Sequence, residues 1–329
     1  MPGAVLPSGS EGGVMVAVPA VAIRAYEEQD RAPVVRLLEH CLPHDRLDEA
    51  VFADRIVDDP DFDPESNLVA AADRQIVGFV AGAPANEHLQ CPAGFKLFAV
   101  APEWRHRRVA TRLFDELETR LRATGTARAV ALAAGNNRLT QGLDVRYTAA
   151  LCFLEARGYE RTGVTQDMSV ALGQTDLDTA PAEAAAATDG IQFRRAIPAD
   201  RTWLHEGVAR ELAYPAPRVH LGRRWAYLAT LGLDRQPATV QVAEETTSGA
   251  FLGFGATHVA RWGVLGPMGV AERARGRGIG AVLLKRCLRE LRAEGFDQGE
   301  IYSVGPIAFY AKTVNATISR VLYQLAKQL

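Results

Sequence analysis

The sequence repeats itself at long range, and this repeat constrains the fold more than any other feature. Ile23-Arg24 recurs as Phe193-Arg194, and Asp30-Arg31 recurs as Asp200-Arg201, each at an offset of 170 residues (193 − 23). The same offset relates further pairs far along the chain: Val100 and Val270, Arg105 and Arg275, Val109 and Ile279, Leu113 and Leu283, Leu121 and Leu291, Gly125 and Gly295. Two copies of so long a unit indicate a duplicated domain and not a solenoid.

The length agrees with two domains, since 329 residues at about 150 residues per domain leave room for two cores. We expect the first domain over 21–172 and the second over 191–329. Residues 173–190 contain the small, polar and Ala-rich stretch QTDLDTAPAEAAAATDG, which predicts a linker with room for a helical turn. Residues 1–20 carry neither a basic start nor a long apolar segment, so we expect a disordered tail there.

The bulk composition excludes several classes of protein. Apolar residues make up 48% and charged residues 23%, as in ordinary globular domains. The net charge of −2 argues against a nucleic-acid partner, and no run of about 18 apolar residues points to a membrane. The four cysteines lack CxxC spacing, so we expect no disulfide, no metal site and a cytoplasmic location.

Each half shows the same alternation of strand-like and helix-like segments. Short apolar strands are expected over 68–71, 76–81 and 98–100, and again over 239–243, 251–259 and 267–270. A long amphipathic helix should then begin near Ile279 and end at Gly295. The pattern predicts an α/β fold in which each half has a mixed sheet flanked by helices.

The stretch AERARGRGIGAVLL, residues 271–284, lies between a strand and this helix. The first N–H groups of a helix have no partner within it, and glycines let an anion approach that backbone closely. Arg275 and Arg277 add positive charge. We therefore expect a phosphate or pyrophosphate site over 275–280, the alternative being a surface turn with solvated arginines.

Two motifs fit these letters. Gly276-x-Gly278-x-x-Ala281 matches the dinucleotide fingerprint, but AERAR separates Val270 from the first glycine, and too little chain follows for a second nucleotide-binding half. Val270-x4-Arg275-x-x-Gly278-x-Gly280, followed by Leu283-Leu284, resembles the acyl-CoA pyrophosphate loop of the GNAT N-acetyltransferase superfamily. Because the pattern recurs in both halves, the chain resembles a tandem GNAT protein.

The resemblance implies a fold, a co-substrate and site residues. Acetyl-CoA would lie between two parting strands, with its pyrophosphate on the loop and its pantetheine arm along the preceding strand. A backbone N–H of that strand would polarise the thioester carbonyl. The cofactor-binding residues implied in this way are Met268, Gly269, Val270, Arg275, Gly276, Arg277, Gly278, Ile279 and Gly280.

The first half departs from the motif. In PEWRHRRVATRLF, residues 102–114, Arg108 stands where the second half has Gly278. Its side chain would occupy the space of phosphate oxygens, and an arginine tolerates a left-handed φ poorly. We therefore expect the first half to be degenerate and the second to be catalytic.

The family's tyrosine helix also differs between the halves. The pattern A-x-x-x-Y-x-x-x-G-F is met by Ala150 and Gly158, but Leu154 occupies the tyrosine position. In the second half Tyr310 lies in a related FYxK context, with Asn315 five residues later where the pattern has Gly after four. The resemblance makes Tyr310 the expected catalytic residue, as the acid that protonates the leaving thiolate.

The base and the acceptor are less constrained. His258, Glu244 and Glu245 are the candidate bases, each with an ordinary structural role as the alternative. The acceptor pocket is expected over 204–225, with Tyr214, Trp225 and Tyr227 nearby and Glu206 and Glu211 available to a cationic amine.

The expected function is acetyl transfer from acetyl-CoA to a small-molecule amine, by direct attack in a ternary complex. Small amines, amino sugars, aminoglycosides and amino-acid derivatives all remain open as acceptors. A lapsed CoA-binding or partner-binding module is the alternative function. The chain is expected as a monomer with pseudo-dimeric halves or as a homodimer.

Overall fold

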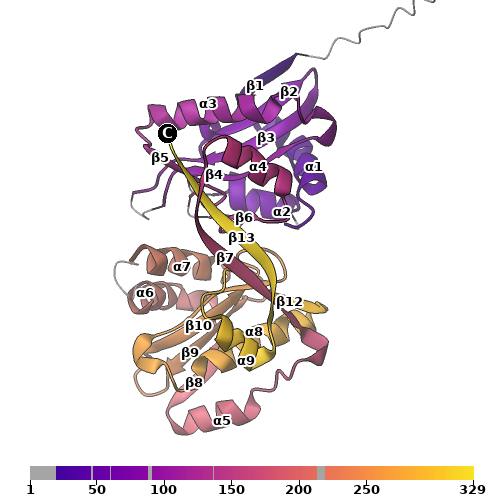
Figure 1. The fold of residues 1–329 in the computed structure, drawn as a ribbon. Helices are drawn as coiled ribbons and strands as arrows, with labels where there is room; N and C mark the ends of the chain where they lie inside the picture. Colours follow the sequence, from indigo (N-terminus) through magenta and orange to yellow (C-terminus); the bar gives the residue numbers. More distant parts are fainter. Residues whose placement is uncertain (1–19, 46, 60, 88–90, 136, 213–218) are drawn as a thin grey trace, which may run out of the picture.

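A single mixed sheet of thirteen strands runs through both halves of the molecule (Figure 1). The computed structural model describes residues 20–45, 47–59, 61–87, 91–135, 137–212 and 219–329. Residues 1–19, most of the expected tail, lie outside this set, as does Tyr214. No helix in the described part is long and apolar enough to cross a membrane.

The first half follows the predicted alternation of strands and helices. Its strands are β1 (Val21–Ala25), β2 (Asn67–Ala72), β3 (Gln75–Ala83), β4 (Gly94–Val100), β5 (Arg128–Ala131), β6 (Leu143–Asp144) and β7 (Glu160–Ala171). Its α-helices are α1 (Arg31–Cys41), α2 (Glu49–Phe52), α3 (Val109–Ala123) and α4 (Thr148–Ala156), with a short helical segment over Ala53–Val57.

The second half repeats this order. Its strands are β8 (Ile191–Arg195), β9 (Val240–Glu245), β10 (Phe251–Thr257), β11 (Val264–Val270), β12 (Gln298–Ile301) and β13 (Thr317–Gln328). Its α-helices are α6 (Arg201–Glu211), α7 (Val219–Leu231), α8 (Ile279–Ala293) and α9 (Ile307–Val314). Both halves therefore have the predicted mixed α/β fold.

The two halves exchange their last strands. The order across the sheet is β1-β2-β3-β4-β5-β13-β7-β12-β11-β10-β9-β8. The end of β13 pairs with β5 of the first half, from Leu325 opposite Ala131 to Gln328 opposite Arg128. The end of β7 pairs with β12 of the second half, from Met168 opposite Ile301 to Ala171 opposite Gln298. Each half is thus completed by a strand of the other.

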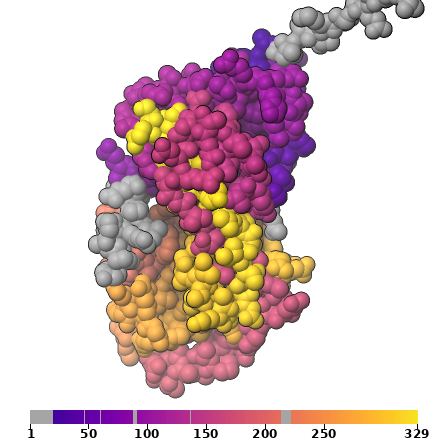
Figure 2. Space-filling model, in the orientation of Figure 1, coloured from indigo at the N-terminus to yellow at the C-terminus, as the bar shows by residue number. Residues whose placement is uncertain are grey.

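The two exchanged strands also pair with each other. They run antiparallel between Thr317 opposite Ser169 and Ala326 opposite Glu160, and cross between the halves in Figure 1. In Figure 2 the yellow C-terminal residues reach the surface of the first half, among residues coloured indigo to magenta. The separate sheets expected for the two halves are therefore joined into one.

An ion pair explains why the opening residues of the repeat are alike. Arg24 donates to both carboxylate oxygens of Asp30, at 2.6 and 2.7 Å, just after β1. Arg194 does the same to Asp200 after β8, at 2.6 and 3.0 Å. Each aspartate also accepts a backbone N–H three residues earlier, so the pair fixes the turn that leads from strand to helix.

The predicted amphipathic helix is α8, and its apolar side is buried against the sheet. Ile279, Leu283, Cys287 and Leu291 are each at most 1% exposed. Gly295 has φ +93° and ends the helix, and the N–H of Phe296 donates to the carbonyl of Leu291. This confirms the C-terminal glycine expected from the sequence.

The expected linker forms a helix, α5 (Ala180–Thr188). Glu183 of α5 accepts hydrogen bonds from Arg286 of α8 at 2.9 and 3.1 Å, and Thr179 accepts one from Arg289 at 3.1 Å. The Ala tract therefore forms a longer helix than the single turn that we expected. Arginines of α8 stabilise it by pairing with its acidic first turn.

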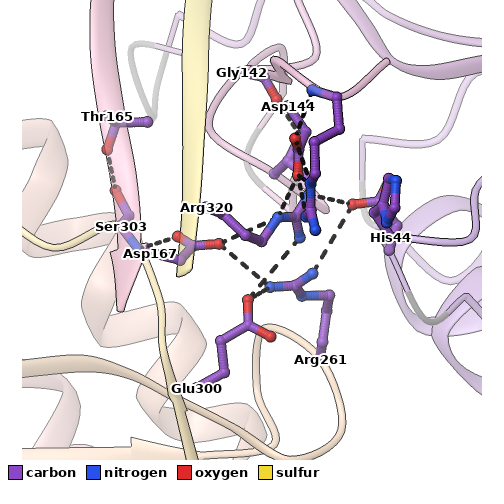
Figure 3. A network of polar contacts seen from close by, with 12 residues as sticks. His44, Gly142, Asp144, Thr165, Asp167, Arg261, Glu300, Ser303 and Arg320 are labelled. Atoms are coloured by element: carbon purple, nitrogen blue, oxygen red, sulfur yellow. Dashed lines mark hydrogen bonds and ion pairs between the residues drawn. The ribbon is translucent and has the colours of Figure 1, made fainter. Parts of the chain in front are cut away.

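Charged side chains from both halves meet where the exchanged strands cross (Figure 3). Arg320 of β13 donates to Asp144 and to Asp45, at 2.8 Å in each case. Asp167 of β7 lies 3.5 Å from Arg261, which also pairs with Glu300. The acids Asp45, Asp144 and Asp167 come from the first half, so the network holds the two halves together.

Burial and pairing act in opposite directions on these acids. Burial by itself raises the pKa of Asp144, but hydrogen bonds from Arg146 and Arg320 lower this pKa to about 2. Burial raises the pKa of Asp167 to about 6, because Arg261 and Arg320 offset only part of the lost hydration.

Replacing Arg320 with leucine should destabilise the whole fold. Arg320 is 6% exposed, and its loss leaves two buried carboxylates, Asp45 and Asp144, without these bonds. We expect the free energy of unfolding to fall by about 3–5 kcal/mol, measured by urea denaturation. The matched control is Arg201→Leu, which removes an ion pair between two exposed side chains, Arg201 and Asp234, and should cost less than about 1 kcal/mol. Equal losses for both variants would contradict this account.

Candidate functional site

The second half contains the parted strands that the sequence pattern implies. β11 and β12 are parallel and pair only at Val264 with Glu300 and at Leu265 with Ile301. β11 continues to Val270, so 266–270 have no strand partner on that side among the described residues. Met268, Gly269 and Val270 pair with β10 on the other side. An extended ligand would thus meet a free strand edge here.

The loop over 275–280 connects this strand to α8. Gly276 and Gly278 have φ +78° and +77°, a left-handed conformation that favours glycine. A Cβ added at either glycine would meet no atom within 4 Å, so both face open space. The Arg275 Nε donates to the carbonyl of Val270 at 3.4 Å, which holds the loop against the end of β11.

The backbone of this loop is a set of free donors. The N–H of Arg275 is bonded to Glu272, and the N–H groups of Ala281 and Val282 are bonded to Gly278. Between them, the N–H groups of 276–280, Ile279 and Gly280 included, have no acceptor among the described residues. Successive free N–H groups at a helix start, with Arg277 and Arg275 beside them, form an anion-binding site.

The first-half loop has the same backbone, contrary to part of the expectation. His106 and Arg108 adopt φ +60° and +61°, close to the values of Gly276 and Gly278, so the arginine does take up the left-handed conformation. Arg105 also repeats the bond of Arg275, donating to the carbonyl of Val100 at 3.2 Å. The difference between the loops is the added side chains, since Cβ atoms occupy positions that are open in the second half.

The parted strands of the first half differ more strongly. β4 and β5 pair only at Gly94 with Val130 and at Phe95 with Ala131. The next residue is Lys96, which is 4% exposed and bonded to Asp59 and to the carbonyl of Arg55. Further along β4, the Phe98 ring packs against Phe114 and Phe153, with centroids 5.1 and 5.9 Å apart. Where the second half has Gly266 and Met268, the first half thus has an ion pair and an aromatic cluster.

Tyr310 lies on α9 and is 8% exposed. The N–H of Ala316 donates to the carbonyl of Tyr310, as that of Tyr159 does to Leu154 in the first half. Because both bonds close the end of the helix, Tyr310 corresponds to Leu154. The turn in the second half is one residue longer, which accounts for the spacing between Tyr310 and Asn315. Burial raises the pKa of Tyr310 to about 12. The adjacent Phe309 would lie 3.4 Å from a Cβ at Gly280, so α9 contacts the start of α8.

The three candidate bases lie elsewhere. His258 is 2% exposed, accepts the N–H of Gly263 at 3.0 Å and has its Nε2 atom 2.8 Å from Glu294, near the far end of α8. Glu244 pairs with Arg194, with a shortest contact of 2.9 Å, and Glu245 bonds Ser248 in a turn. Each has a structural role, and none joins Tyr310 at the parted strands.

Residues of α7 and at the end of α6, in the segment expected to form the acceptor pocket, contact β11. A Cβ at Gly269 would lie 2.7 Å from Leu212 and 3.3 Å from Trp225. Glu206 is exposed, and Glu211 lies 3.6 Å from Arg273, so neither acid lines this contact. Two hollows of about 390 and 460 Å³ lie away from it, beside α1 and beside Arg320. Among the described residues no group of three or more His, Cys, Asp or Glu side chains could hold a metal ion.

Four polar residues near the parted strands were not predicted from the sequence. Lys96 lies in β4, Arg138 follows β5, Arg224 lies in α7, and Tyr302 follows β12. None of the four belongs to a recognisable sequence motif. The one signal available was the 170-residue repeat, which pairs Lys96 with Gly266 and so marks Lys96 as a difference between the halves.

Comparisons with known proteins agree with this geometry. The model of the Acetyltransferase (GNAT) family matches residues 31–142 and again residues 204–313, together about two thirds of the chain. A search of curated proteins gave no match.

Three solved structures share the fold over 94% of this chain. A GCN5-related glucosamine N-acetyltransferase region of a fungal multi-domain β-N-acetylglucosaminidase has a TM-score of 0.72 at 19% identity, and this chain spans 38% of it. A tandem GNAT protein from the clavulanic acid biosynthesis pathway has a TM-score of 0.68 at 14% sequence identity, and this chain covers 98% of it. A GCN5-related N-acetyltransferase from Sphaerobacter thermophilus has a TM-score of 0.65 at 18% sequence identity, and this chain covers 95% of it. The chain belongs to the GNAT family of acetyltransferases and contains the family's domain twice.

Proposed function

We propose that the second half transfers an acetyl group from acetyl-CoA to the amine of a small molecule, by direct attack in a ternary complex in the cytoplasm. The observation that carries this proposal is the loop over 275–280, whose free N–H groups and open glycines lie at the end of a parted strand. When bound, acetyl-CoA supplies an acetyl group already activated as a thioester.

The chain's own residues provide the binding. The N–H groups of 276–280, with Arg275 and Arg277, would hold the pyrophosphate. The free edge of β11 over 266–270 would pair with the amide groups of the pantetheine arm. A backbone N–H near Gly269 and Val270 would then stabilise the negative charge that develops on the carbonyl oxygen.

Tyr310 would supply the proton. The neutral amine attacks the thioester carbonyl, the C–N bond forms, the C–S bond breaks, and the sulfur leaves as a thiolate. A hydroxyl whose pKa is about 12 remains protonated at neutral pH and is available to protonate that thiolate. The surplus proton of the amine passes to water, because His258, Glu244 and Glu245 are all bonded elsewhere, and water returns a proton to the Tyr310 oxygen.

The first half would not bind acetyl-CoA in this proposal. Arg108 projects from its loop, Lys96 and Asp59 pair beside the parted strands, and Phe98 packs into an aromatic cluster. This half would complete the sheet of the second half through β7 and wall its acceptor side. The alternative is a module that binds CoA without turnover, which the lack of a base at the site keeps open.

Titration of the purified chain with acetyl-CoA should give one site per chain by calorimetry. Gly278→Arg should abolish this binding, because it places a side chain in the open space of the loop. The matched control is Gly295→Arg, at the other end of α8, where φ is +93° and a Cβ also meets no atom within 4 Å. The control carries the same backbone strain and should bind normally. Two sites, or normal binding by Gly278→Arg, would contradict the assignment.

Tyr310→Phe should lower kcat by 10²- to 10⁴-fold, the range for loss of an acid catalyst, and leave the affinity for acetyl-CoA unchanged. Because the folded state raises the tyrosine's pKa to about 12, wild-type kcat should show no decline attributable to this group below pH 10. Release of CoA thiol measures both quantities. Full activity of Tyr310→Phe would assign the residue to the core alone, and turnover by no amine despite acetyl-CoA binding would favour the non-catalytic module.

A further inference from the structure

Three arginines gather at the junction of the halves, beside the parted strands of the second half. Arg55 and Arg224 are 2% and 6% exposed. Arg138 is partly exposed and follows Asn137, whose amide oxygen accepts a hydrogen bond from Arg55, and the charges of Arg138 and Arg55 both lower the pKa of Arg224. Together with Tyr302 we call these residues the cationic cluster. Arg55 and Arg138 belong to the first half, whereas Arg224 and Tyr302 belong to the second.

The neighbouring carboxylates already have cations. Asp54 lies 3.4 Å from Arg55 and 3.4 Å from Arg235, and Asp59 pairs with Lys96. For Arg138, the described residues provide a bond from Nη1 to the amide oxygen of Gln141 at 3.1 Å, and no carboxylate. Within the described part of the chain, the buried guanidinium of Arg138 therefore has no carboxylate beside it.

Three polar atoms of the cluster have no hydrogen-bond partner, among them the Nη2 of Arg55, which lies 3.4 Å from Asp54. The hydroxyl of Tyr302 and the Nε of Arg138 are buried and form no hydrogen bond within the described part of the chain. Burial of donors without acceptors costs free energy, as does burial of like charges close together. Burial first, and then repulsion from Arg138 and Arg55, lower the pKa of Arg224 to about 9. An anion between these groups would remove both costs.

Tyr302 of the cluster lies where β11 and β12 part. The N–H of Tyr302 donates to the carbonyl of Leu265, the last residue of β11 that pairs with β12, at 2.9 Å. A Cβ at Gly266, the first unpaired residue, would lie 3.4 Å from the Tyr302 Cβ. Arg224 precedes Trp225, which covers Gly269. Tyr302 therefore lies at the closed end of the parted strands, at the opposite end of β11 from the loop over 275–280.

We propose that the acceptor is an amine that also carries an anionic group, a carboxylate or phosphate, which the cationic cluster binds. This inference rests on the proposed function and names its substrate class. The planar guanidinium groups of Arg138 and Arg224 suit either anion, and the Tyr302 hydroxyl adds one donor. With the anion held there, the amine of the same molecule faces the free edge of β11.

The proposal also gives the first half a role in substrate recognition. Arg55 and Arg138 reach the cluster from that half, on the segment after α2 and on the loop after β5. A half that no longer binds acetyl-CoA would then still supply two of the three guanidinium groups of the acceptor site.

The first test measures anion binding without catalysis. The chain loaded with CoA is titrated by calorimetry with succinate and, separately, with inorganic phosphate, at constant ionic strength. We expect one saturable site for at least one anion, weakened at least ten-fold in Arg138→Gln and partly restored in Arg138→Lys. The matched control, Arg146→Gln, changes a junction arginine that pairs with Asp144 and should bind like wild type. No saturable binding, or equal binding by Arg138→Gln, would overturn the proposal.

The second test compares acceptors. Amino acids, their amides, the corresponding amines without the carboxylate, and phosphoethanolamine are assayed for CoA release. We expect acceptors that carry an acidic group to be acetylated faster than their neutral partners. Comparing phosphoethanolamine with the amino acids shows whether the site prefers a phosphate or a carboxylate. In Arg138→Gln the KM of the acidic acceptor should rise at least ten-fold, while the KM of acetyl-CoA stays unchanged.

The outcomes separate the two proposals. Preference for neutral amines would overturn the anionic acceptor and leave the acetyltransferase assignment intact. Absence of acetyl-CoA binding would overturn the proposed function and, with it, the inference of an anionic acceptor.

Discussion

The antiparallel pairing of β7 with β13 is the interaction on which the rest of the structure depends. Each strand continues past this pair to complete the sheet of the opposite half, so neither half closes without the other. The crossing brings Arg320, Asp45 and Asp144 together from distant parts of the chain. It also brings Asp54, on the segment after α2, to 3.4 Å from Arg235 of the second half. The junction is thus as much a product of backbone pairing as of side-chain contacts.

The halves show how a duplicated fold keeps its backbone while its chemistry changes. His106 and Arg108 retain the left-handed conformation of Gly276 and Gly278, although such residues cost about 1–3 kcal/mol each. The pairing of Val100 with Gly78 of β3 and the bond from Arg105 to the carbonyl of Val100 hold the loop in place despite this cost. What differs is the strand before the loop, where Lys96 pairs with Asp59 and Phe98 packs against Phe114. The backbone of the two loops is therefore alike although the side chains along it differ.

The repeat, the strand order within each half, α8 and its terminal glycine were all predictable, because periodicity and glycine placement are local signals. The strand exchange was not, since two copies of one pattern pair equally well with their own or with the other's last strand. The spacing of Tyr310 from Asn315 looked irregular, yet one turn absorbs the extra residue. Arg138, Arg224 and Tyr302 carry no motif, and only the fold brings them together.

The strand exchange also has a consequence for synthesis on the ribosome. β5 emerges roughly 190 residues before the part of β13 that pairs with it. At about 5–20 residues per second, its edge stays open for on the order of 10–40 s while the second half is made. An open edge of this kind is a template for pairing with other nascent chains. A molecular chaperone that shields β5 during elongation would therefore decide how much of the polypeptide reaches the native state.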